Sequence, residues 1–354
     1  MRDAERAEAR VRGPSAPPAA AGGLARAYHL ARPFLPFVLA GGLVAGLLLT
    51  VDAGAIRDEL GKADLAWLPL ILAANFASDW FRGVRWQHLL SPLQRPGVAL
   101  LFAASQVGST VNLVLPFRAG EAVRVRIVSQ RSGLSVSSLV GSLFAEILSD
   151  LVAFSTYTIV GLLLLEEAAF LWPLAPAFGV LLIAGLTFGY YVARRVDRGP
   201  GQLPSSGEGR LRVWFHRELH NFAAGLQSLR DPTVMFHVTW SAQATWLCEA
   251  VMFYACGRAL GLDLSVGAYL LLVVAVNVAG GVPLTQAGVG VFEVTLTGVM
   301  VALGVDEAQA VAYAIFLHVL LSAPHIVSGP LAALALRVSL ADVLFLRGRR
   351  EEAA

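Results

Sequence analysis

The chain has 354 residues, of which 56% are hydrophobic and only 15% are charged. Soluble domains carry roughly 25% charged residues, so this composition excludes an ordinary water-soluble domain. The 27 basic and 25 acidic residues leave a net charge of +2, which gives no indication of nucleic-acid binding. We therefore expect an all-α, polytopic integral membrane protein.

The first 33 residues are rich in arginine, alanine and proline, and we expect them to form a disordered basic cytoplasmic tail. Six later segments are apolar and long enough to cross the ~30 Å hydrocarbon core of a bilayer. They lie near 34–51, 65–82, 138–165, 170–193, 234–257 and 308–336. Two further apolar stretches, at 98–115 and 266–282, run directly into polar breaks.

Basic residues are distributed unevenly along the chain. All except Arg57, Lys62 and Arg258 fall in the five segments 1–33, 82–97, 116–137, 194–233 and 337–354. The positive-inside rule places these segments in the cytoplasm. All five can share that side only if 98–130 dips into the membrane from the cytoplasm and returns. By the same argument, 266–303 must enter and return from the outside.

We therefore predict about six spanning helices plus two re-entrant helical hairpins in a cell (inner) membrane. The flippase-like domain would cover 34–336, with halves at about 34–165 and 170–336 related as an inverted repeat. Both termini, including a tail at 337–354, would be cytoplasmic. Leucines and phenylalanines at helical spacing predict an amphipathic helix at about 210–230, lying on the inner leaflet.

The two polar breaks share one order of residue types: Asn, Pro, Gly and then Glu. The first contains Asn112, Pro116, Arg118, Gly120 and Glu121. The second contains Asn277, Pro283, Gln286, Gly288, Gly290 and Glu293. Charged, glycine-broken backbone is tolerated at membrane depth only where protein buries it or where it lines a wet cavity. Paired breaks in two halves of a chain indicate a transporter-like site.

Four markers carry a resemblance to a known family. They are Pro116-Phe-Arg-Ala-Gly-Glu121 followed by Arg124, the element from Pro283 to Glu293, Arg82-Gly-Val-Arg85-Trp86, and the acidic pair Glu146 and Asp150. On these residues, 34–336 resembles the flippase-like transmembrane region of lysylphosphatidylglycerol synthases. The resemblance implies movement of a phospholipid or a polyprenyl-phosphate-linked headgroup between leaflets. It does not extend to an aminoacyl-transferase domain, so we expect a transporter and not an enzyme.

Arg118 offers a forked donor that suits a phosphate. Gly120 permits the turn, and a helix beginning after it would direct backbone N–H groups at an anion. Glu121 would receive a headgroup ammonium or, alternatively, pair with Arg118 to hold the hairpin together. In the second half, Glu293 is the counterpart, accompanied by Asn277, Gln286 and Gly288. We hypothesise that the Arg118 half holds phosphate and the Glu293 half holds the cationic or hydroxylated part of the headgroup.

Glu146 and Asp150 are four residues apart and therefore share one helix face. They suit proton coupling or a cation site, or else they pair with Arg118 or Arg124 inside the bundle. Arg82, Arg85 and Trp86 are interpreted as anchors at the membrane interface. Asp79 and Glu249, two further acids in apolar segments, are left open. His318 and His325 have no third ligand at metal spacing, so neither a metal nor a cofactor is expected.

Two alternatives to lipid transport remain at this point. The first is a membrane-embedded transferase acting on lipid-linked sugars, with Glu146 and Asp150 as acid/base groups or metal ligands. The second is a non-transporting anchor for an envelope enzyme. The sequence has no nucleotide-binding motif such as a Walker loop, so ATP-driven transport is not expected. Membrane lipids, either anionic phospholipid or polyprenyl phosphate, are the expected partners, and no nucleic acid is expected.

Overall fold

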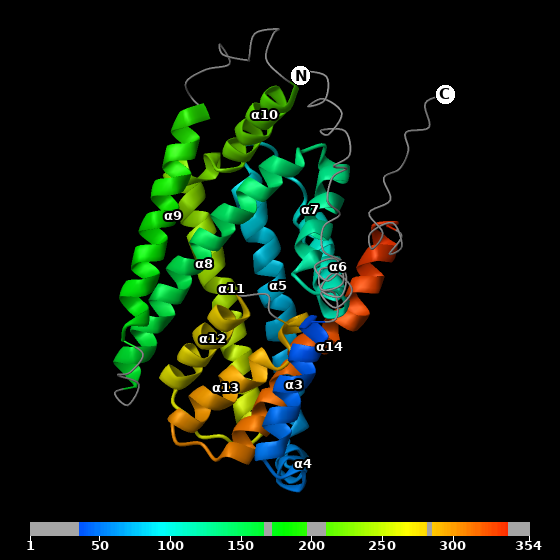
Figure 1. The fold of residues 1–354 in the computed structure, drawn as a ribbon, viewed down its shortest axis with the longest axis vertical. Helices are drawn as coiled ribbons and strands as arrows, with labels where there is room; N and C mark the ends of the chain where they lie inside the picture. The colour runs from blue at the N-terminus through cyan, green and yellow to red at the C-terminus, as the bar shows by residue number, and fades with distance from the viewer. Residues whose placement is uncertain (1–34, 166–171, 197–209, 282–284, 339–354) are drawn as a thin grey trace, which may run out of the picture.

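The computed structural model describes residues 35–165, 172–196, 210–281 and 285–338. Within these ranges the fold is all-α, as expected: twelve α-helices, three short 3-10 turns and no strand (Figure 1). The first six helices are α3 (Leu35–Thr50), α4 (Ala53–Gly61), α5 (Leu68–Leu90), α6 (Val98–Val114), α7 (Ala119–Ser132) and α8 (Val136–Leu164). The others are α9 (Leu174–Val196), α10 (Arg210–Gly225), α11 (Pro232–Ala259), α12 (Val266–Gly280), α13 (Val291–Ala302) and α14 (Glu307–Ala335). The turns are η2 (Leu65–Trp67), η5 (Gln227–Arg230) and η6 (Gln286–Gly288).

Each of the six segments expected to span a membrane coincides with one helix: α3, α5, α8, α9, α11 or α14. By length and composition alone, two helices in the described ranges are long and apolar enough to cross a membrane: α8 and α14. Each has 29 residues, or ~43 Å at 1.5 Å per residue. α5 is long enough to cross a membrane, but its charged residues Asp79, Arg82 and Arg85 make the helix less apolar.

Both predicted hairpins are present as helix pairs. α6 and α7 pack against one another, as do α12 and α13. Figure 1 shows the first pair in the upper half of the bundle and the second in the lower half. Both connections contain left-handed backbone, at Phe117 and Arg118 in the first and at Ala287 and Gly288 in the second.

Two glycines allow α6 and α7 to approach closely. A Cβ placed on Gly120 would lie 1.9 Å from the backbone oxygen of Gly108, and one placed on Gly108 would lie 2.8 Å from the oxygen of Gly120. The amide of Gly120 also donates to Oδ1 of Asn112 at 2.7 Å. Gly120 therefore serves helix packing as well as the turn.

We expect Gly120→Ala to separate α6 from α7, because the clashing atom is backbone and cannot swing away. Overpacking of this kind costs about 1–3 kcal/mol. Gly298→Ala, in an exposed turn of α13 with nothing within 4 Å of the added Cβ, is the matched control. Thermal unfolding in detergent should show a lowered midpoint for Gly120→Ala and an unchanged one for Gly298→Ala. Equal midpoints would contradict the proposed close packing.

Each hairpin packs into its own hydrophobic core. The core around α6 and α7 includes Leu101, Ile127 and Leu139, together with the end of α5 and the start of α11. The core around α12 and α13 includes Leu272 and Met300, together with the later part of α11 and the start of α14. α5, α11 and α14 contribute to both cores and therefore connect the two hairpins.

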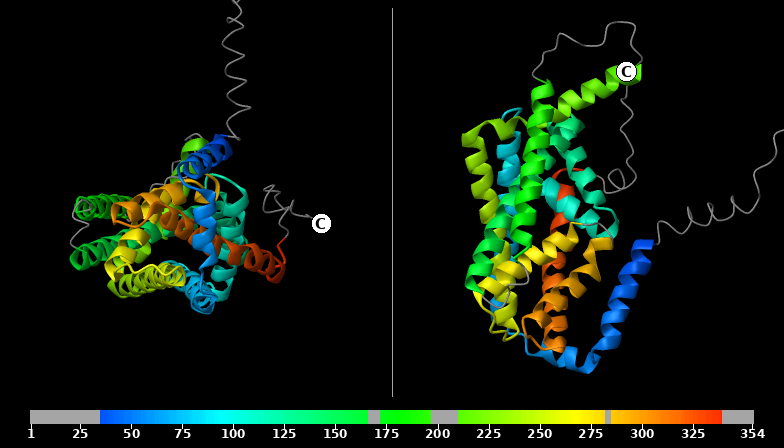
Figure 2. Two further views of the ribbon diagram at one scale, coloured as in Figure 1. Left: turned by 90° about the horizontal axis from the view of Figure 1, so that it is seen from below. Right: turned by 60° about the vertical axis from the view of Figure 1, so that its left-hand side comes forward.

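α10 covers most of the predicted amphipathic helix and packs against α8. A Cβ on Gly141 would lie 2.1 Å from the oxygen of Phe222, and one on Gly225 would lie 2.0 Å from the oxygen of Ser138. The helix is therefore docked on the bundle by close backbone contact. α3, by contrast, stands at the side of the molecule (Figure 2), where it contacts α13 and η6.

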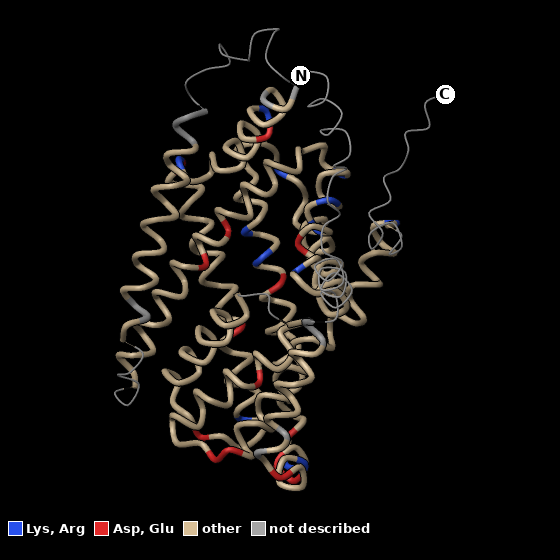
Figure 3. The backbone as a smooth tube through the Cα atoms, viewed as in Figure 1, with Lys and Arg blue, Asp and Glu red and all other residues tan. Residues whose placement is uncertain are grey.

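Charged residues divide between the two ends of the bundle. Figure 3 shows most of the described basic residues toward the end that carries α7 and α10. Acidic residues gather at the opposite end, around α4 and the loop before α14. This division matches the charge asymmetry on which the orientation was predicted. The predicted tails, 1–33 and 337–354, lie almost wholly outside the described residues.

Candidate functional site

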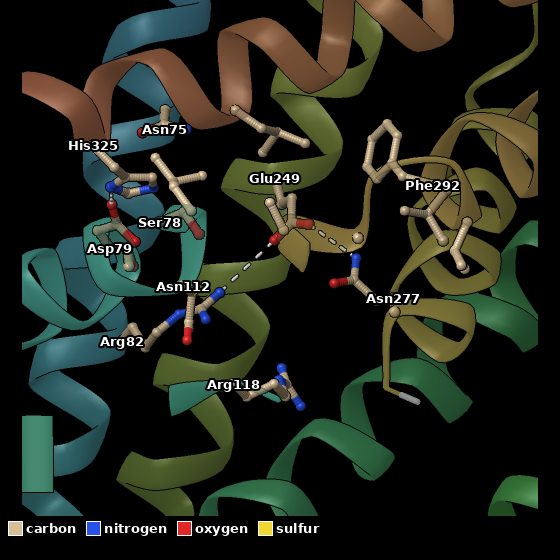
Figure 4. A pocket seen from close by; sticks show the side chains of 18 of the residues that line it. Asn75, Ser78, Asp79, Arg82, Asn112, Arg118, Glu249, Asn277, Phe292 and His325 are labelled. Atoms are coloured by element: carbon tan, nitrogen blue, oxygen red, sulfur yellow. Dashed lines mark hydrogen bonds and ion pairs between the residues drawn. The ribbon is translucent and has the colours of Figure 1, made fainter. Parts of the chain in front are cut away.

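A pocket of ≈ 310 Å³ lies where the two hairpin connections meet (Figure 4). α5, α11 and α14 supply its walls, and the ends of α6 and α12 also line it. Of the residues singled out in the sequence, those that line it are Asp79, Arg82, Asn112, Arg118, Glu249, Asn277, Gly288 and His325. The sequence pattern thus predicted residues from both hairpin connections that line the pocket.

One wall is a polar stripe on α5 formed by Asn75, Ser78, Asp79 and Arg82. These positions follow the i, i+3, i+4, i+7 spacing that places side chains on one helix face. The stripe is a signal that sequence reasoning missed, because the segment was assessed for its apolarity and not for the periodicity of its polar residues.

Glu249, on α11, connects this wall to the second hairpin. Its carboxylate lies 4.0 Å from the guanidinium of Arg82, and it accepts a hydrogen bond from Nδ2 of Asn277 at 2.9 Å. Figure 4 shows both interactions crossing the pocket. Glu249, and not Glu293, is therefore the acid of the second half that lines the pocket.

Arg118 points into the pocket (Figure 4), and its backbone is left-handed at φ 53°. No described residue forms an ion pair with it. The alternative in which Glu121 neutralises Arg118 does not describe the structure, because Glu121 pairs instead with Arg124 at 2.6 Å. Two arginines and two carboxylates thus line the pocket, and one of these arginines is unpaired among the described residues.

A second cluster of polar side chains connects α5, α6 and α14. Nε2 of Gln106 donates to Asp79 at 2.9 Å, and Oε1 of Gln106 lies 2.8 Å from Nδ1 of His325. The same imidazole nitrogen lies 3.9 Å from the Asp79 carboxylate. Gln106 thus holds Asp79 and His325 close to each other at the pocket wall.

Within the described part of the chain, three lining residues carry a buried polar atom with no hydrogen-bond partner: Oδ1 of Asn75, Nε of Arg82 and Oγ1 of Thr285. Buried polar groups in proteins are nearly always hydrogen-bonded, to protein or to water. An acceptor and two potential donors without partners around one cavity suit a hydrated polar ligand.

A separate buried ion network lies beside the pocket, between α5, α7 and α8. The guanidinium of Arg85 binds Glu146 at 2.9 Å and also Asp150. Arg124 binds the other oxygen of Glu146 at 3.3 Å as well as Glu121. Glu146 therefore pairs with Arg124, as one of the alternatives had it, whereas Asp150 pairs with Arg85, which neither alternative named.

Arg85 and Trp86 do not lie at the protein surface, as interface anchors would. Both are 0% exposed. Trp86 donates to the hydroxyl of Ser142 at 3.0 Å, and the Arg124 guanidinium lies 4.9 Å from its ring. The acidic pair on α8 accounts for this difference, since it offers a buried partner that local sequence spacing does not reveal. Arg82 is also drawn inward, toward Glu249.

Glu293 is placed outside the pocket by the start of α13. One carboxylate oxygen accepts from the amide of Gly290 at 2.6 Å, capping the helix. The other lies 2.6 Å from Nδ1 of His318. The side chain of Gln286 lies outside the described residues. In the part of the chain with described side chains, no three His, Cys, Asp or Glu residues are placed to hold a metal ion.

Residues 34–329 match the family model described as the lysylphosphatidylglycerol synthase TM region. The chain belongs to this family. It is accordingly an integral membrane protein, and the family assignment agrees with the resemblance seen in the two polar breaks.

Two relatives from archaea extend this comparison. Glycosyltransferase AglD of Haloferax volcanii is 30% identical over 347 residues, which cover 84% of this chain and 55% of AglD. A UPF0104 membrane protein of Methanothermobacter thermautotrophicus is 23% identical over 266 residues, covering 70% of this chain and 78% of that protein. The chain thus spans about half the length of AglD. No solved structure matches it.

Proposed function

We propose that the protein moves a lipid between membrane leaflets by passing its headgroup through the pocket between the two hairpin connections. The cargo is a phospholipid or a polyprenyl-phosphate-linked headgroup. The observation that carries the proposal is Arg118, a guanidinium without an ion-pair partner among the described residues, directed into a polar pocket. Placing a charge at the centre of a bilayer costs at least ~2.5–3.5 kcal/mol, so an unpaired one is expected to have a ligand.

The distribution of charge supports a headgroup with two kinds of polar group. Arg118 would bind the phosphate through its planar fork. Glu249 on α11 and Asp79 on α5 would accept hydrogen bonds from an ammonium or from hydroxyls. This assignment keeps the hypothesis that the two halves hold different parts of the headgroup, with Glu249 in place of Glu293.

The proposed topology follows from the charge asymmetry of the chain. α3, α5, α8, α9, α11 and α14 would span the membrane, and the α6–α7 and α12–α13 pairs would enter as re-entrant hairpins from opposite faces. Both termini would be cytoplasmic, in the inner membrane. Inverted repeats of this kind place a binding site near the bilayer midplane, where the pocket would open alternately to each leaflet.

Reconstitution into vesicles containing a fluorescent phospholipid tests the proposal. Arg118→Ala should slow lipid movement by about ten- to a hundredfold, since a hydrogen bond to a charged group contributes about 1.5–3 kcal/mol. Arg118→Lys should recover part of the rate, because it retains the charge without the fork. Arg95→Ala, in the exposed loop between α5 and α6, is the matched control. Equal rates for Arg118→Ala and Arg95→Ala would refute the proposal.

A second candidate is a role in transfer to lipid-linked sugars. It is favoured by the 30% identity to a protein named as a glycosyltransferase. Against it, the carboxylates of Glu146 and Asp150 are bound by Arg85, Arg124 and the indole of Trp246. Turnover of a lipid-linked sugar by the isolated protein, without lipid movement, would favour this candidate. Stable co-purification with an envelope enzyme, again without lipid movement, would favour an anchoring role.

A further inference from the structure

A second pocket, of ≈ 480 Å³, adjoins the first on the outer face of α14. It lies between that helix and the ends of both hairpin connections. We call it the α14 groove. Its α14 wall includes Ile315, Val319 and Ile326, whose spacing places them along one face of the helix.

The α14 groove adjoins the headgroup pocket. Leu113, from the first hairpin, and Ala287, from the second, line both spaces. A path between the pocket and the groove would therefore have to open between one side chain from each hairpin. Beside it, the rings of Phe292, which lines the pocket, and His318, which lines the groove, lie 4.5 Å apart.

The chemistry of the groove differs from that of the pocket. Val319 and Ile326 are 56% and 62% exposed, and under the proposed topology, in which α14 spans the membrane, these side chains would face hydrocarbon. The charged groups of the groove, Glu293 and His318, are bound to each other at 2.6 Å, and Glu293 also caps α13. Neither is free to hold a polar ligand, so the groove suits an apolar one.

The length of the groove gives a second indication of its ligand. Ile315 to Ile326 covers ~16 Å of helix at 1.5 Å per residue. This is about half the ~30 Å hydrocarbon core of a bilayer, the depth of one leaflet. An alkyl chain extended along α14 matches this dimension.

We propose that the α14 groove binds a hydrocarbon chain of the same lipid whose headgroup occupies the adjoining pocket. The inference rests on the proposed function and adds to it a route of entry. The lipid enters sideways from the bilayer, with its headgroup passing between Leu113 and Ala287 while its chain stays against α14. The chain thus remains in an apolar environment throughout.

Photo-crosslinking tests the occupant directly. Val319 is replaced by benzoylphenylalanine, and the protein is reconstituted with phosphatidylglycerol and phosphatidylethanolamine. After irradiation, the adducts are identified and quantified by mass spectrometry. The control is the same replacement at Val327, a valine of similar exposure (64%) on the same helix that lines neither pocket. We expect a lipid adduct that is larger at 319 than at 327 and that falls to the level at 327 in Arg118→Ala. Equal lipid adducts, or an adduct with the protein itself, would overturn the proposal.

A transport measurement separates this inference from the function on which it rests. Val319→Trp should slow lipid movement by about tenfold, the effect of obstructing a hydrophobic pocket, and Val327→Trp should match the parent. Val319→Phe provides a smaller obstruction in case the tryptophan variant does not fold. Slow transport in Arg118→Ala with normal transport in both 319 variants would reject the groove and keep the function. Normal transport in Arg118→Ala would reject the function itself.

Discussion

Arg85→Met is expected to be among the most destabilising single substitutions in this protein. Arg85 is 0% exposed, and its guanidinium binds both Glu146 and Asp150. Methionine would leave Asp150 without an ion-pair partner and Glu146 with Arg124 alone. Removing one member of a buried ion network costs about 3–5 kcal/mol. Thermal unfolding in detergent should show a midpoint lower by several degrees and a poor yield of monodisperse protein.

A surface arginine and a compensating variant provide the controls. Arg258 pairs with Asp263 at 3.0 Å, but the side chains are 39% and 97% exposed, and such pairs contribute about 0–1 kcal/mol. Arg258→Met should therefore unfold like the parent. Adding Glu146→Gln and Asp150→Asn to Arg85→Met should restore part of the stability, because no buried charge then lacks a partner. Similar midpoints for Arg85→Met and Arg258→Met would show that the network does not hold α5 to α8.

Glu249→Gln is expected to have the largest effect on cargo selectivity. Glutamine keeps the shape and can still accept from Asn277, but it leaves Arg82 and Arg118 facing Asp79 alone. Headgroups that carry an ammonium should lose a charged hydrogen bond of about 1.5–3 kcal/mol. Transport of phosphatidylethanolamine should therefore fall by about tenfold or more relative to phosphatidylglycerol, measured in parallel vesicle assays.

Glu293→Gln is the informative comparison for that prediction. Glu293 caps α13 through Gly290 and binds His318, and it lies outside the pocket. Glutamine also serves at this cap position, so selectivity between the two lipids should match the parent. If Glu293→Gln changed selectivity and Glu249→Gln did not, the original assignment of Glu293 would be correct and the assignment of Glu249 wrong.

The helices and the two breaks were predictable because both depend on local sequence. Long apolar runs define the helices, and the glycines and the Asn–Pro–Gly–Glu order mark the connections. Asn112, Arg118, Asn277 and Gly288 consequently lie in one pocket, as their pairing in the sequence indicated. The functions assigned to them remain predictions.

The partners of the charged residues were not predictable, because they depend on how distant helices pack. Glu146 and Asp150 are 61 and 65 residues from Arg85, and nothing in their local spacing indicates that contact. Likewise, Glu249 and not Glu293 lines the pocket beside Asp79, and this depends on how α11 packs against α12. The polar stripe from Asn75 to Arg82 was present in the sequence and was missed.

The central claim is that the hairpin connections meet around a wet pocket that receives a lipid headgroup. It is tested most directly by labelling Leu115→Cys and Ala287→Cys, one on each connection, in protein whose Cys248 and Cys256 are replaced by alanine. Ser142→Cys, at a position 0% exposed, sets the background for a water-soluble maleimide applied to vesicles. The account predicts that both connection cysteines react well above background and that the transported lipid slows both reactions. Background labelling of either cysteine in folded protein would contradict it.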